Sequence, residues 1–428
     1  MDDLLSFPAQ VQRWLDVEAA LARACAAAGL VETGQADAVA EACHVDRIDL
    51  RALDDDAATA ATPVIPLLRQ LATAVPREAL PAVHLGATSQ DILDTALVLF
   101  LRDGLRVLVE ELLGAGDRCA ELAQDHHGTV MTGRTLLQPA VPVTFGLKAA
   151  RWLAALARHL ERLYGLGFHV QLGGAAGTLA AYGERGLEVT MRLAEELDLD
   201  VPALPWHAER DLLQEVAATL ALVAGTCATI GHELVLLAQA EVGEVTDAGA
   251  GGSSAMPQKR NPVDATFAVA AGRSAAAAAA AVLTGDLHEH ERSAGAWQAE
   301  WATVPRLVES TVVAAARARR ALEGCRVDAA RMRANLDAAG DQLAAEPLAV
   351  ALTAHLGREE AHALVAELAT RAAATGAGLL DLARGTPAVS AVLTGEELDR
   401  LRDPHGYLGV TDALIDRALD RWHRVAVG

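Results

Sequence analysis

The sequence predicts an all-α fold, and three observations support this prediction. Aromatic residues make up only 3% of the 428 residues, alternating strand patterns are scarce, and long runs of Ala, Leu, Val, Arg and Glu dominate the chain. Most of these residue types favour helices, and the apolar ones recur at helical spacing. A chain of this length can bury the cores of two or three domains. We expect three helical domains, over residues 1–90, 91–325 and 326–428, with a bundle of long helices in the second.

The N-terminal region is expected to be a series of helices. Apolar residues at helical spacing predict an amphipathic helix over Pro8–Gly29, with Gly29 as its C-terminal stop. Shorter helices are expected up to about Pro81. A long helix is then expected to about His126, after the string His84-Leu-Gly-Ala-Thr-Ser-Gln-Asp91. Thr88 and Ser89 are good N-cap residues, and capping alone could explain them. Hydroxyls and free amide N–H groups at a helix start can also bind a carboxylate.

The central region contains the longest helical patterns. A polar break over Gly128–Pro142 is interpreted as a turn between two helices. Helical periodicity then covers Val143–Val170, breaks at Gly173–Gly177 and resumes. The stretch Glu209–Val242 predicts one helix of about 50 Å, at ~1.5 Å per residue. Because a single small domain cannot bury a helix of that length, we expect the bundle to associate with copies of itself.

Gly249–Pro262 is expected to form a mobile polar loop between two long helices. It reads Gly-Ala-Gly-Gly-Ser-Ser-Ala-Met-Pro-Gln-Lys-Arg-Asn-Pro, and its glycines allow close approach to a ligand. Lys148 and Lys259 are the only lysines among 36 Lys and Arg residues, so the chain has a compact ammonium group here where it otherwise uses Arg. A surface linker is the alternative interpretation. The spacing fits neither a phosphate-binding loop nor a nucleophile elbow.

The part of the chain after this loop predicts a further long helix and then a smaller domain. Ala265–Leu283 is the most membrane-like stretch, but it is mostly Ala and carries Arg273, so a buried, close-packed helix is favoured. In His288-Glu-His-Glu-Arg-Ser293 the two histidines suggest a metal, yet no third and fourth ligand has a convincing spacing. Arg292 and Ser293 are better candidates for contact with an anion. From about residue 326, shorter helices are expected.

Charge and cysteine usage limit the possible partners and compartment. The formal net charge of −21 argues against binding to nucleic acid or to anionic membrane surfaces, and an anionic substrate would need local cations. The five cysteines are scattered, which indicates a reducing compartment without a disulfide framework or zinc site. With no secretory signal visible, a cytoplasmic location is expected.

Two strings resemble signature regions of the fumarase/aspartase superfamily, whose members add or eliminate a group beside a carboxylate. Gly-Ser-Ser-Ala-Met-Pro-Gln-Lys-Arg-Asn-Pro resembles the signature loop. The resemblance implies that Ser253 transfers a proton, with Lys259 as a second catalytic residue and Asn261 beside a substrate carboxylate. His84-Leu-Gly-Ala-Thr-Ser-Gln-Asp91 resembles the first signature region, which implies a catalytic His84. Together with the matching regions further along the chain, the resemblance to the superfamily implies these substrate contacts: Thr88, Ser89, Gln90, Arg134, Thr135, Gln138, Arg292 and Ser293.

Within the superfamily, the chain looks most like the bacterial 3-carboxy-cis,cis-muconate cycloisomerase branch. The branch-specific match is His-Glu-His-Glu-Arg-Ser, followed by Trp297 and Glu300-Trp301. It implies closure of a tricarboxylate diene to a lactone without metal or cofactor, by a homotetramer whose active sites are shared between subunits. Leu136, Pro139 and Thr266 depart from residues usual in the family or the branch. A lyase that releases fumarate or a related acid, and a paralogue without catalysis, are the alternatives; the intact Ser253 argues against the second.

Overall fold

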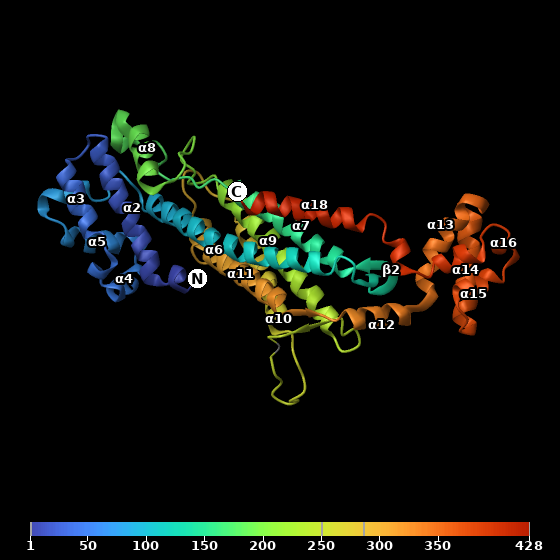
Figure 1. Ribbon diagram of the computed structural model, residues 1–428. Helices are drawn as coiled ribbons and strands as arrows, with labels where there is room; N and C mark the ends of the chain where they lie inside the picture. Colours follow the sequence, from blue (N-terminus) through green and yellow to red (C-terminus); the bar gives the residue numbers. More distant parts are fainter. Residues whose placement is uncertain (1, 250, 286, 428) are drawn as a thin grey trace. The chain divides into compact units, whose positions relative to one another are not determined.

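The chain folds into two compact units. The computed structural model describes residues 2–249, 251–285 and 287–427, which are mostly helical (Figure 1). Unit 1 comprises Met1–Glu111, Glu161–Gly225 and Ala270–Ala315. Unit 2 comprises Leu112–Leu160, Thr226–Val269 and Ala316–Gly428. Each unit therefore combines distant stretches of the sequence, and the domain boundaries at 90 and 325 stay a prediction.

Helices account for most of the described residues. The α-helices are α1 (Asp2–Leu5), α2 (Phe7–Ala27), α3 (Thr33–Ala42), α4 (Leu50–Ala57), α5 (Val64–Ala74), α6 (Ser89–Asp125), α7 (Phe145–Tyr164), α8 (Gly186–Leu197), α9 (Asp211–Ala238), α10 (Val263–Leu283), α11 (Ala296–Gly324), α12 (Ala329–Ala339), α13 (Ala345–Leu356), α14 (Arg358–Thr375), α15 (Leu379–Arg384), α16 (Pro387–Ser390), α17 (Gly395–Arg400) and α18 (Thr411–Ala426). Short 3-10 helices are η1 (Val45–Arg47), η2 (Arg77–Ala82), η3 (Ala180–Arg185), η4 (Gly340–Ala344) and η5 (Pro404–Tyr407).

The apolar core of unit 1 gathers around α2. Val11, Leu15 and Leu21 of α2 are fully buried, and the core continues into α3, α5, α8 and the start of α6. The predicted helix over Pro8–Gly29 is confirmed to within two residues. Ser6 caps its start by accepting from the backbone N–H of Ala9 at 3.3 Å. Gly29 adopts a φ of +72° after its end, a left-handed conformation that favours glycine.

A β-hairpin replaces the predicted helix-to-helix turn over Gly128–Pro142. Strands β1 (Val130–Thr135) and β2 (Gln138–Thr144) pair antiparallel, and β3 (Val245–Asp247) pairs with β4 (Cys325–Val327). The helical fold class is confirmed for most of the chain, but the helix-to-helix turn is wrong. Both hairpin strands are rich in β-branched Val and Thr, which favour a pleated conformation. The two connecting residues are leucines, so the usual Asn-Gly turn signal is missing.

Two long helices are shorter than the periodicity predicts, and a third matches its predicted position. The helix predicted over Glu209–Val242 is α9, which ends at Ala238 before a turn where Gly243 adopts a φ of +63°. The pattern over Val143–Val170 is the shorter α7, which stops just before Gly165. Helix α10 matches its predicted position, and one stripe of its residues is buried within the chain, as expected for a packed helix.

Two of these helices also pass the length and composition test for a membrane span. They are α9 and α10, and part of each apolar stretch is buried inside the chain, as in core helices of soluble proteins. Burial of this kind is consistent with helix packing in a bundle, which needs no lipid.

Unit 2 contains a second, separate apolar core near the C-terminus. Figure 1 shows α13, α14, α15 and α16 gathered into a small cluster. Leu348, Leu352 and Leu368 are fully buried within it. Helix α18 does not belong to this core: Trp422 is buried, and its indole N–H donates to Asp117 of α6 at 2.9 Å. The C-terminal helix is thus fixed to the long-helix part of the same unit.

Candidate active site

The predicted site residues fall into two groups, one in each compact unit. Unit 1 holds His84, Thr88, Ser89, Gln90, Arg292 and Ser293. Unit 2 holds Arg134, Thr135, Gln138, Ser253, Lys259 and Asn261.

In unit 1, Asp91 organises the start of α6. Its buried carboxylate accepts from the backbone N–H groups of Thr88, Gly173 and Gly174 at 2.9, 2.9 and 3.0 Å, and His207 Nε2 lies 2.7 Å from it. A carboxylate with several N–H donors is strongly held in place. Asp91 therefore anchors the Gly173–Gly174 segment against α6.

This anchoring brings backbone segments into close contact. Gly86 adopts a φ of +71°, and a Cβ atom there would lie 2.6 Å from the Tyr182 ring. A Cβ on Gly173 would lie 2.5 Å from the imidazole of His207. Glycine is required at both positions, because any side chain would push the segments apart. Ser89 is held from another side, since its hydroxyl accepts from Thr62 Oγ1 at 3.0 Å.

His84 forms an ion pair behind the α6 start. Its Nδ1 atom lies 2.6 Å from Oε1 of Glu18, a fully buried residue of α2. Burial of the ring favours its neutral form, but the charge of Glu18 and its hydrogen bond outweigh burial and raise the pKa of His84. The side chain of His84 is still 16% exposed. The exposed edge of the ring can therefore reach a ligand from this position.

Gln90 and Arg292 act together. The buried Gln90 amide donates to Asp94 Oδ2 at 3.1 Å and to the His207 carbonyl at 3.0 Å, and it accepts from Arg292 Nε at 3.0 Å. Arg292 Nη2 also donates to the Gly174 carbonyl at 3.3 Å. The Gln90 amide therefore orients the Arg292 guanidinium.

A buried charge cluster lies beside this pair. Arg210 donates to Asp94 at 2.7 and 3.1 Å and to Glu300 at 3.1 Å, and its guanidinium stacks 4.9 Å above the Trp206 ring. Trp297 donates its indole N–H to Asp94 at 3.0 Å. Burial raises the pKa of Glu300, although Arg210 opposes the shift. The cluster fixes α6 and α11 relative to the Arg292 loop.

Ser293 has a capping role in the structure. It is buried, and its hydroxyl accepts from the N–H of Ala296 at the start of α11 at 3.2 Å. A hydroxyl used this way stabilises a helix N-terminus.

The same loop contains His288, whose buried side chain lies 3.5 Å from Glu300. Within the described residues, no group of three or more His, Cys, Asp or Glu could hold a metal ion.

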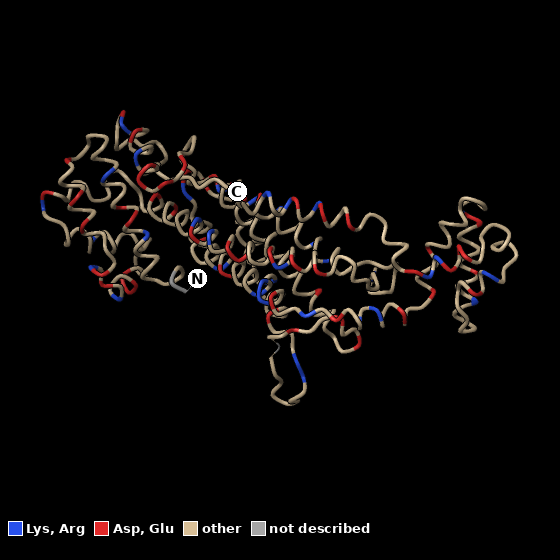
Figure 2. Tube along the Cα trace, in the orientation of Figure 1, with Lys and Arg blue, Asp and Glu red and all other residues tan. Residues whose placement is uncertain are grey.

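In unit 2, the Gly249–Pro262 loop is closed at its base and open at its tip. Gly251 and Asn261 exchange two backbone hydrogen bonds of 3.1 and 2.9 Å, and Asn261 Nδ2 donates to the Gly252 carbonyl at 3.2 Å. The backbone N–H groups of Ala255 and Met256 point to Ser253 Oγ, at 3.3 and 3.1 Å. Figure 2 shows a basic stretch on one arm of this loop. The prediction of a loop is confirmed for the described residues; Ala250 lies outside them.

The hairpin carries the remaining three residues of unit 2. Thr135 and Gln138 are paired at its end, on either side of Leu136 and Leu137. Both leucines adopt positive φ values, +50° and +63°, and they are 97% and 72% exposed. Left-handed conformations are unfavourable for such side chains.

Arg134 braces this hairpin. It pairs with both oxygens of the buried Glu244 at 2.9 and 2.7 Å, and Asn335 of α12 donates to the same carboxylate at 2.8 Å. The bidentate geometry fixes the guanidinium plane. Arg134 therefore joins β1 to the segment before β3 and to α12.

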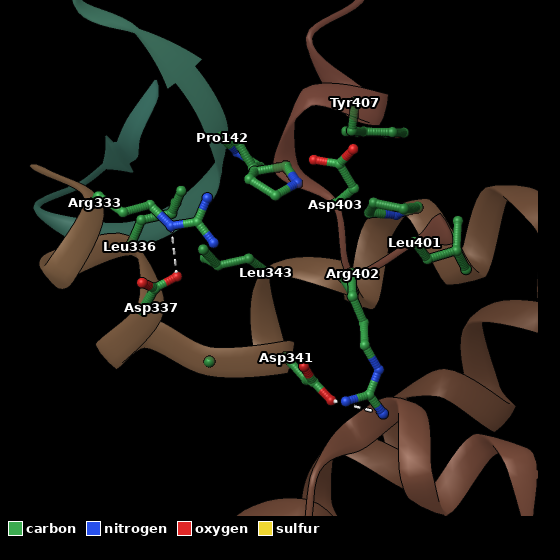
Figure 3. Close-up of a pocket in the computed structure, with 14 residues that line it drawn as sticks. Pro142, Arg333, Leu336, Asp337, Asp341, Leu343, Leu401, Arg402, Asp403 and Tyr407 are labelled. Carbon is green, nitrogen blue, oxygen red and sulfur yellow. Dashed lines mark hydrogen bonds and ion pairs between the residues drawn. The ribbon is translucent and has the colours of Figure 1, made fainter. Parts of the chain in front are cut away.

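Two cavities in the described part of the chain are lined by residues other than those predicted for the site. One, of about 140 Å³ in unit 2, is lined by Pro142, Leu336, Tyr407 and charged side chains (Figure 3). Its arginines are already paired, Arg333 with Asp337 at 2.9 Å and Arg402 with Asp341 at 3.6 Å. The other, of about 380 Å³ in unit 1, is mostly apolar. Neither is lined by a predicted site residue, although the larger one is lined by Asp94 and Thr62, which contact Gln90 and Ser89.

Several residues of the unit 1 site were not predicted from the sequence. They are Glu18, Asp91 as an anchor, Asp94, His207, Arg210 and Glu300. One signal was present: Asp91 and Asp94 lie three residues apart in an otherwise apolar helical run, so both face the same side of α6. Their partners come from distant positions, and helical spacing alone does not identify them.

Comparison with known proteins places the chain in a family. A family model described as Lyase matches residues 5–276, and one described as Adenylosuccinate lyase C-terminus matches residues 341–418. The chain is 43% identical over 423 residues to a 3-carboxy-cis,cis-muconate cycloisomerase of Bradyrhizobium diazoefficiens, covering 97% of this chain and 94% of that protein. It is 41% identical over 425 residues to a nitrosuccinate lyase of Streptomyces davaonensis, covering 95% and 89%.

A solved structure agrees with these sequence matches. The 3-carboxy-cis,cis-muconate lactonizing enzyme from Pseudomonas putida superposes with a TM-score of 0.90 at 43% identity, covering 99% of this chain and 96% of that one. Sequence and fold thus match along nearly the whole chain. The chain belongs to the fumarase/aspartase superfamily of lyases.

Proposed function

We propose that this chain is a 3-carboxy-cis,cis-muconate cycloisomerase. The observation that carries the proposal is the near full-length similarity to enzymes of that name, at 43% and 44% identity over 97% of the chain in Bradyrhizobium diazoefficiens and Pseudomonas aeruginosa. The helical fold of the Pseudomonas putida lactonizing enzyme supports the same assignment.

The proposed reaction is an internal addition. One carboxylate oxygen of the tricarboxylate diene attacks a carbon of a C=C bond, and a C–O bond forms while the π bond breaks. The electron pair moves to the neighbouring carbon, next to another carboxylate, and that carbon takes up a proton. Atoms balance within one molecule, so no oxidant or second substrate is involved. The intermediate carries its charge as an aci-carboxylate, which fixed cations and N–H donors stabilise.

Ser253 is the proposed proton donor. After it gives up its proton, its oxygen carries a negative charge. The N–H groups of Ala255 and Met256 that point to Ser253 Oγ are placed to stabilise that alkoxide. Lys259, six residues further along the same loop, would add a positive charge.

Local cations and donors would bind the substrate against a net charge of −21. We assign the carboxylate contacts to Lys259, Asn261, Arg292, Thr88 and Ser89, with Thr135 and Gln138 on the hairpin. Three predicted contacts receive indirect roles from their geometry: Gln90 positions Arg292, Arg134 braces the hairpin, and Ser293 caps α11.

The proposed assembly is a cytoplasmic homotetramer with active sites shared between subunits. Helix α10 supports self-association, because its Phe267 side chain is 52% exposed and several of its alanines are also exposed. An apolar helix face of this kind is usually covered by another chain. All five cysteines are free and buried, which fits a reducing compartment.

A spectrophotometric assay tests the proposal. Purified protein is mixed with 3-carboxy-cis,cis-muconate, with and without a chelator, and loss of diene absorbance is followed while the product is identified by NMR. Formation of a lactone at the same rate in both samples is expected. Ser253→Ala should lower the rate by about 10²–10⁴-fold with the fold retained. Absence of lactone with folded wild-type protein would contradict the function, and near-normal rates in Ser253→Ala would contradict the role of Ser253.

The second candidate is a lyase that releases an anion from a substituted succinate. The 41% identity to a nitrosuccinate lyase favours it specifically. A leaving group that departs as a stable anion needs no proton from the enzyme. The apolar side chain of Leu136, which cannot donate a proton, therefore does not oppose this reaction. The same purified protein, incubated with substituted succinates, would then release fumarate.

A further inference from the structure

A fully buried carboxylate lies directly behind His84. Glu18 is in α2, its Oε1 atom is 2.6 Å from His84 Nδ1, and no other described group bonds to its Oε2 atom. Placing an isolated carboxylate in an apolar core is costly unless it is paired with a positive charge. His84 is the partner that supplies this charge among the described residues.

The titratable groups around the pair leave this charge balance intact. Burial raises the pKa of Cys25 of α2 and of Cys43 after α3 to about 12 in each case, and it also raises the pKa of Tyr182 of η3. All three are therefore neutral at pH 7. From α6, Asp91 adds one more negative charge, but it is already held by backbone N–H groups and His207. A protonated His84 facing Glu18 thus makes a neutral pair.

The backbone at His84 indicates a functional constraint. Its φ is +51°, an unfavourable value for a residue other than glycine. Such strain persists when the surrounding structure over-determines the conformation. Here Gly86, packed against Tyr182, and the Glu18 contact hold the segment. The Nδ1 atom is committed to Glu18, so Nε2 is the ring atom left for a ligand.

We propose that Glu18 is a positioning residue, which keeps His84 protonated and oriented so that its Nε2–H donates to a substrate carboxylate as negative charge develops there. This inference rests on the proposed function for its substrate. A cationic donor contributes more to a developing aci-carboxylate than a neutral one. Nothing else in the unit 1 group combines a buried counter-ion with an exposed ring edge among the described residues.

Site-resolved hydrogen exchange at the imidazole C2 position tests the charge state directly. His84 is the one histidine between Arg77 and Arg102, so tryptic digestion isolates it for mass spectrometry. The wild-type exchange midpoint should lie above the ordinary value of about 6.5. Glu18→Gln, which keeps the shape and the acceptor oxygen but removes the charge, should lower it. Glu18→Asp keeps the negative charge but moves it further from the imidazole, so it should give an intermediate midpoint. This variant also provides the test if Glu18→Gln does not fold.

The matched control is Glu196→Gln. Glu196 of α8 pairs at the surface with Arg23 of α2, the helix that carries Glu18, at a distance of 3.6 Å. This variant therefore neutralises a carboxylate that contacts α2 but leaves the Glu18–His84 pair in place. It should leave the midpoint unchanged. The rate of lactone formation is also measured as a function of pH. As pH rises, this rate should fall at a lower pH in Glu18→Gln than in wild type, and the change should be mainly in kcat.

The outcomes separate this inference from the proposed function. An unchanged midpoint in folded Glu18→Gln or Glu18→Asp overturns it, as does a lowered midpoint without any change in the pH profile of an active enzyme. If wild-type protein closes no lactone, the proposed function fails while the exchange midpoints still decide whether Glu18 keeps His84 protonated.

Discussion

Asp91 and Asp94 lie three residues apart at the start of α6, and their carboxylates serve different neighbours. Asp91 holds the backbone of Gly173 and Gly174, whereas Asp94 pairs with Arg210 and Trp297. Both are buried, so each depends on its donors for solvation. The two carboxylates therefore fix the segments around the start of α6. Loss of any one hydrogen-bond partner should lower the free energy of unfolding.

Asp91→Asn should destabilise the fold. The amide would direct N–H groups at the N–H groups of Gly173 or Gly174, so one donor loses its acceptor in a buried place. We expect the free energy of unfolding to fall by about 3 kcal/mol. Urea unfolding at fixed protein concentration measures it. Asp103→Asn, at a partly exposed surface pair with Arg13, is the control and should change stability by less than about 1 kcal/mol. Equal small changes in both variants would contradict the anchoring role.

Arg292→Lys tests the role of the guanidinium. Gln90 and the Gly174 carbonyl hold two nitrogens of Arg292, and an ammonium on a flexible stem cannot be held in this way. We expect KM for the tricarboxylate to rise about 10–100-fold, equivalent to one or two charge-assisted hydrogen bonds. Steady-state kinetics measure this. Arg106→Lys, at an exposed position of α6, should leave KM unchanged. If KM in Arg292→Lys equals that of wild type, the guanidinium of Arg292 does not bind the substrate.

The Glu18–His84 pair predicts a pH dependence of stability. The pKa of His84 is raised in the folded protein, so the pair stabilises the fold fully below the unfolded value of about 6.5, and this contribution is lost as pH rises through the folded pKa. Glu18→Gln should therefore lower the melting temperature more at pH 6 than at pH 9. Melting curves of both proteins across this range measure the difference. A loss that is the same at every pH would indicate a packing effect alone.

Local sequence signals and structure disagree most at the β1–β2 hairpin. The turn needs two residues with positive φ, a conformation that Asn-Gly adopts readily and Leu-Leu does not. Leu136 and Leu137 also leave large apolar side chains exposed. A strained and exposed pair of this kind is typical of functional positions. We interpret the hairpin end, between Thr135 and Gln138, as an apolar wall of the substrate site.

The double variant Leu136→Asn, Leu137→Gly tests that interpretation. Removing the strain should stabilise the protein by roughly 1 kcal/mol per residue, so the melting temperature should rise. Lactone formation should fall, because the apolar wall is lost. Thermal melting and kcat/KM are measured on the same samples. A variant that is more stable and equally active would show that the leucines have no part in the reaction.

The elements also show what the sequence could predict. Helix α2, the start of α6 and the polar loop after α9 follow from periodicity, capping residues and glycine content. The hairpin did not, because its strands are short and its turn residues are atypical. In the site, the loop residues and the α6 residues were predicted through family resemblance. Glu18 and Arg210 were not, since pairing between distant charged residues depends on tertiary structure.

The residues assigned to the proposed reaction are divided between the two compact units. Unit 1 offers His84, Thr88, Ser89 and Arg292, and unit 2 offers Ser253, Lys259 and Asn261. The proposed proton donor, Ser253, thus lies in a different unit from the α6 residues that are proposed to bind a carboxylate. A site that draws its two halves from different subunits would need the homotetramer for activity.

Subunit mixing tests this last proposal. One variant, Ser253→Ala, lacks the proton donor of unit 2, and the other, Thr88→Ala with Ser89→Ala, lacks the hydroxyls of unit 1. Each should be inactive alone. If sites are shared, equal random mixing should restore about a quarter of the sites, because some will combine an intact unit 1 from one subunit with an intact unit 2 from another. The variants are dissociated together, reassembled and assayed for lactone formation, and native mass spectrometry confirms mixed tetramers. If confirmed mixed tetramers remain inactive, both halves of each site come from the same chain, and association would then serve stability alone.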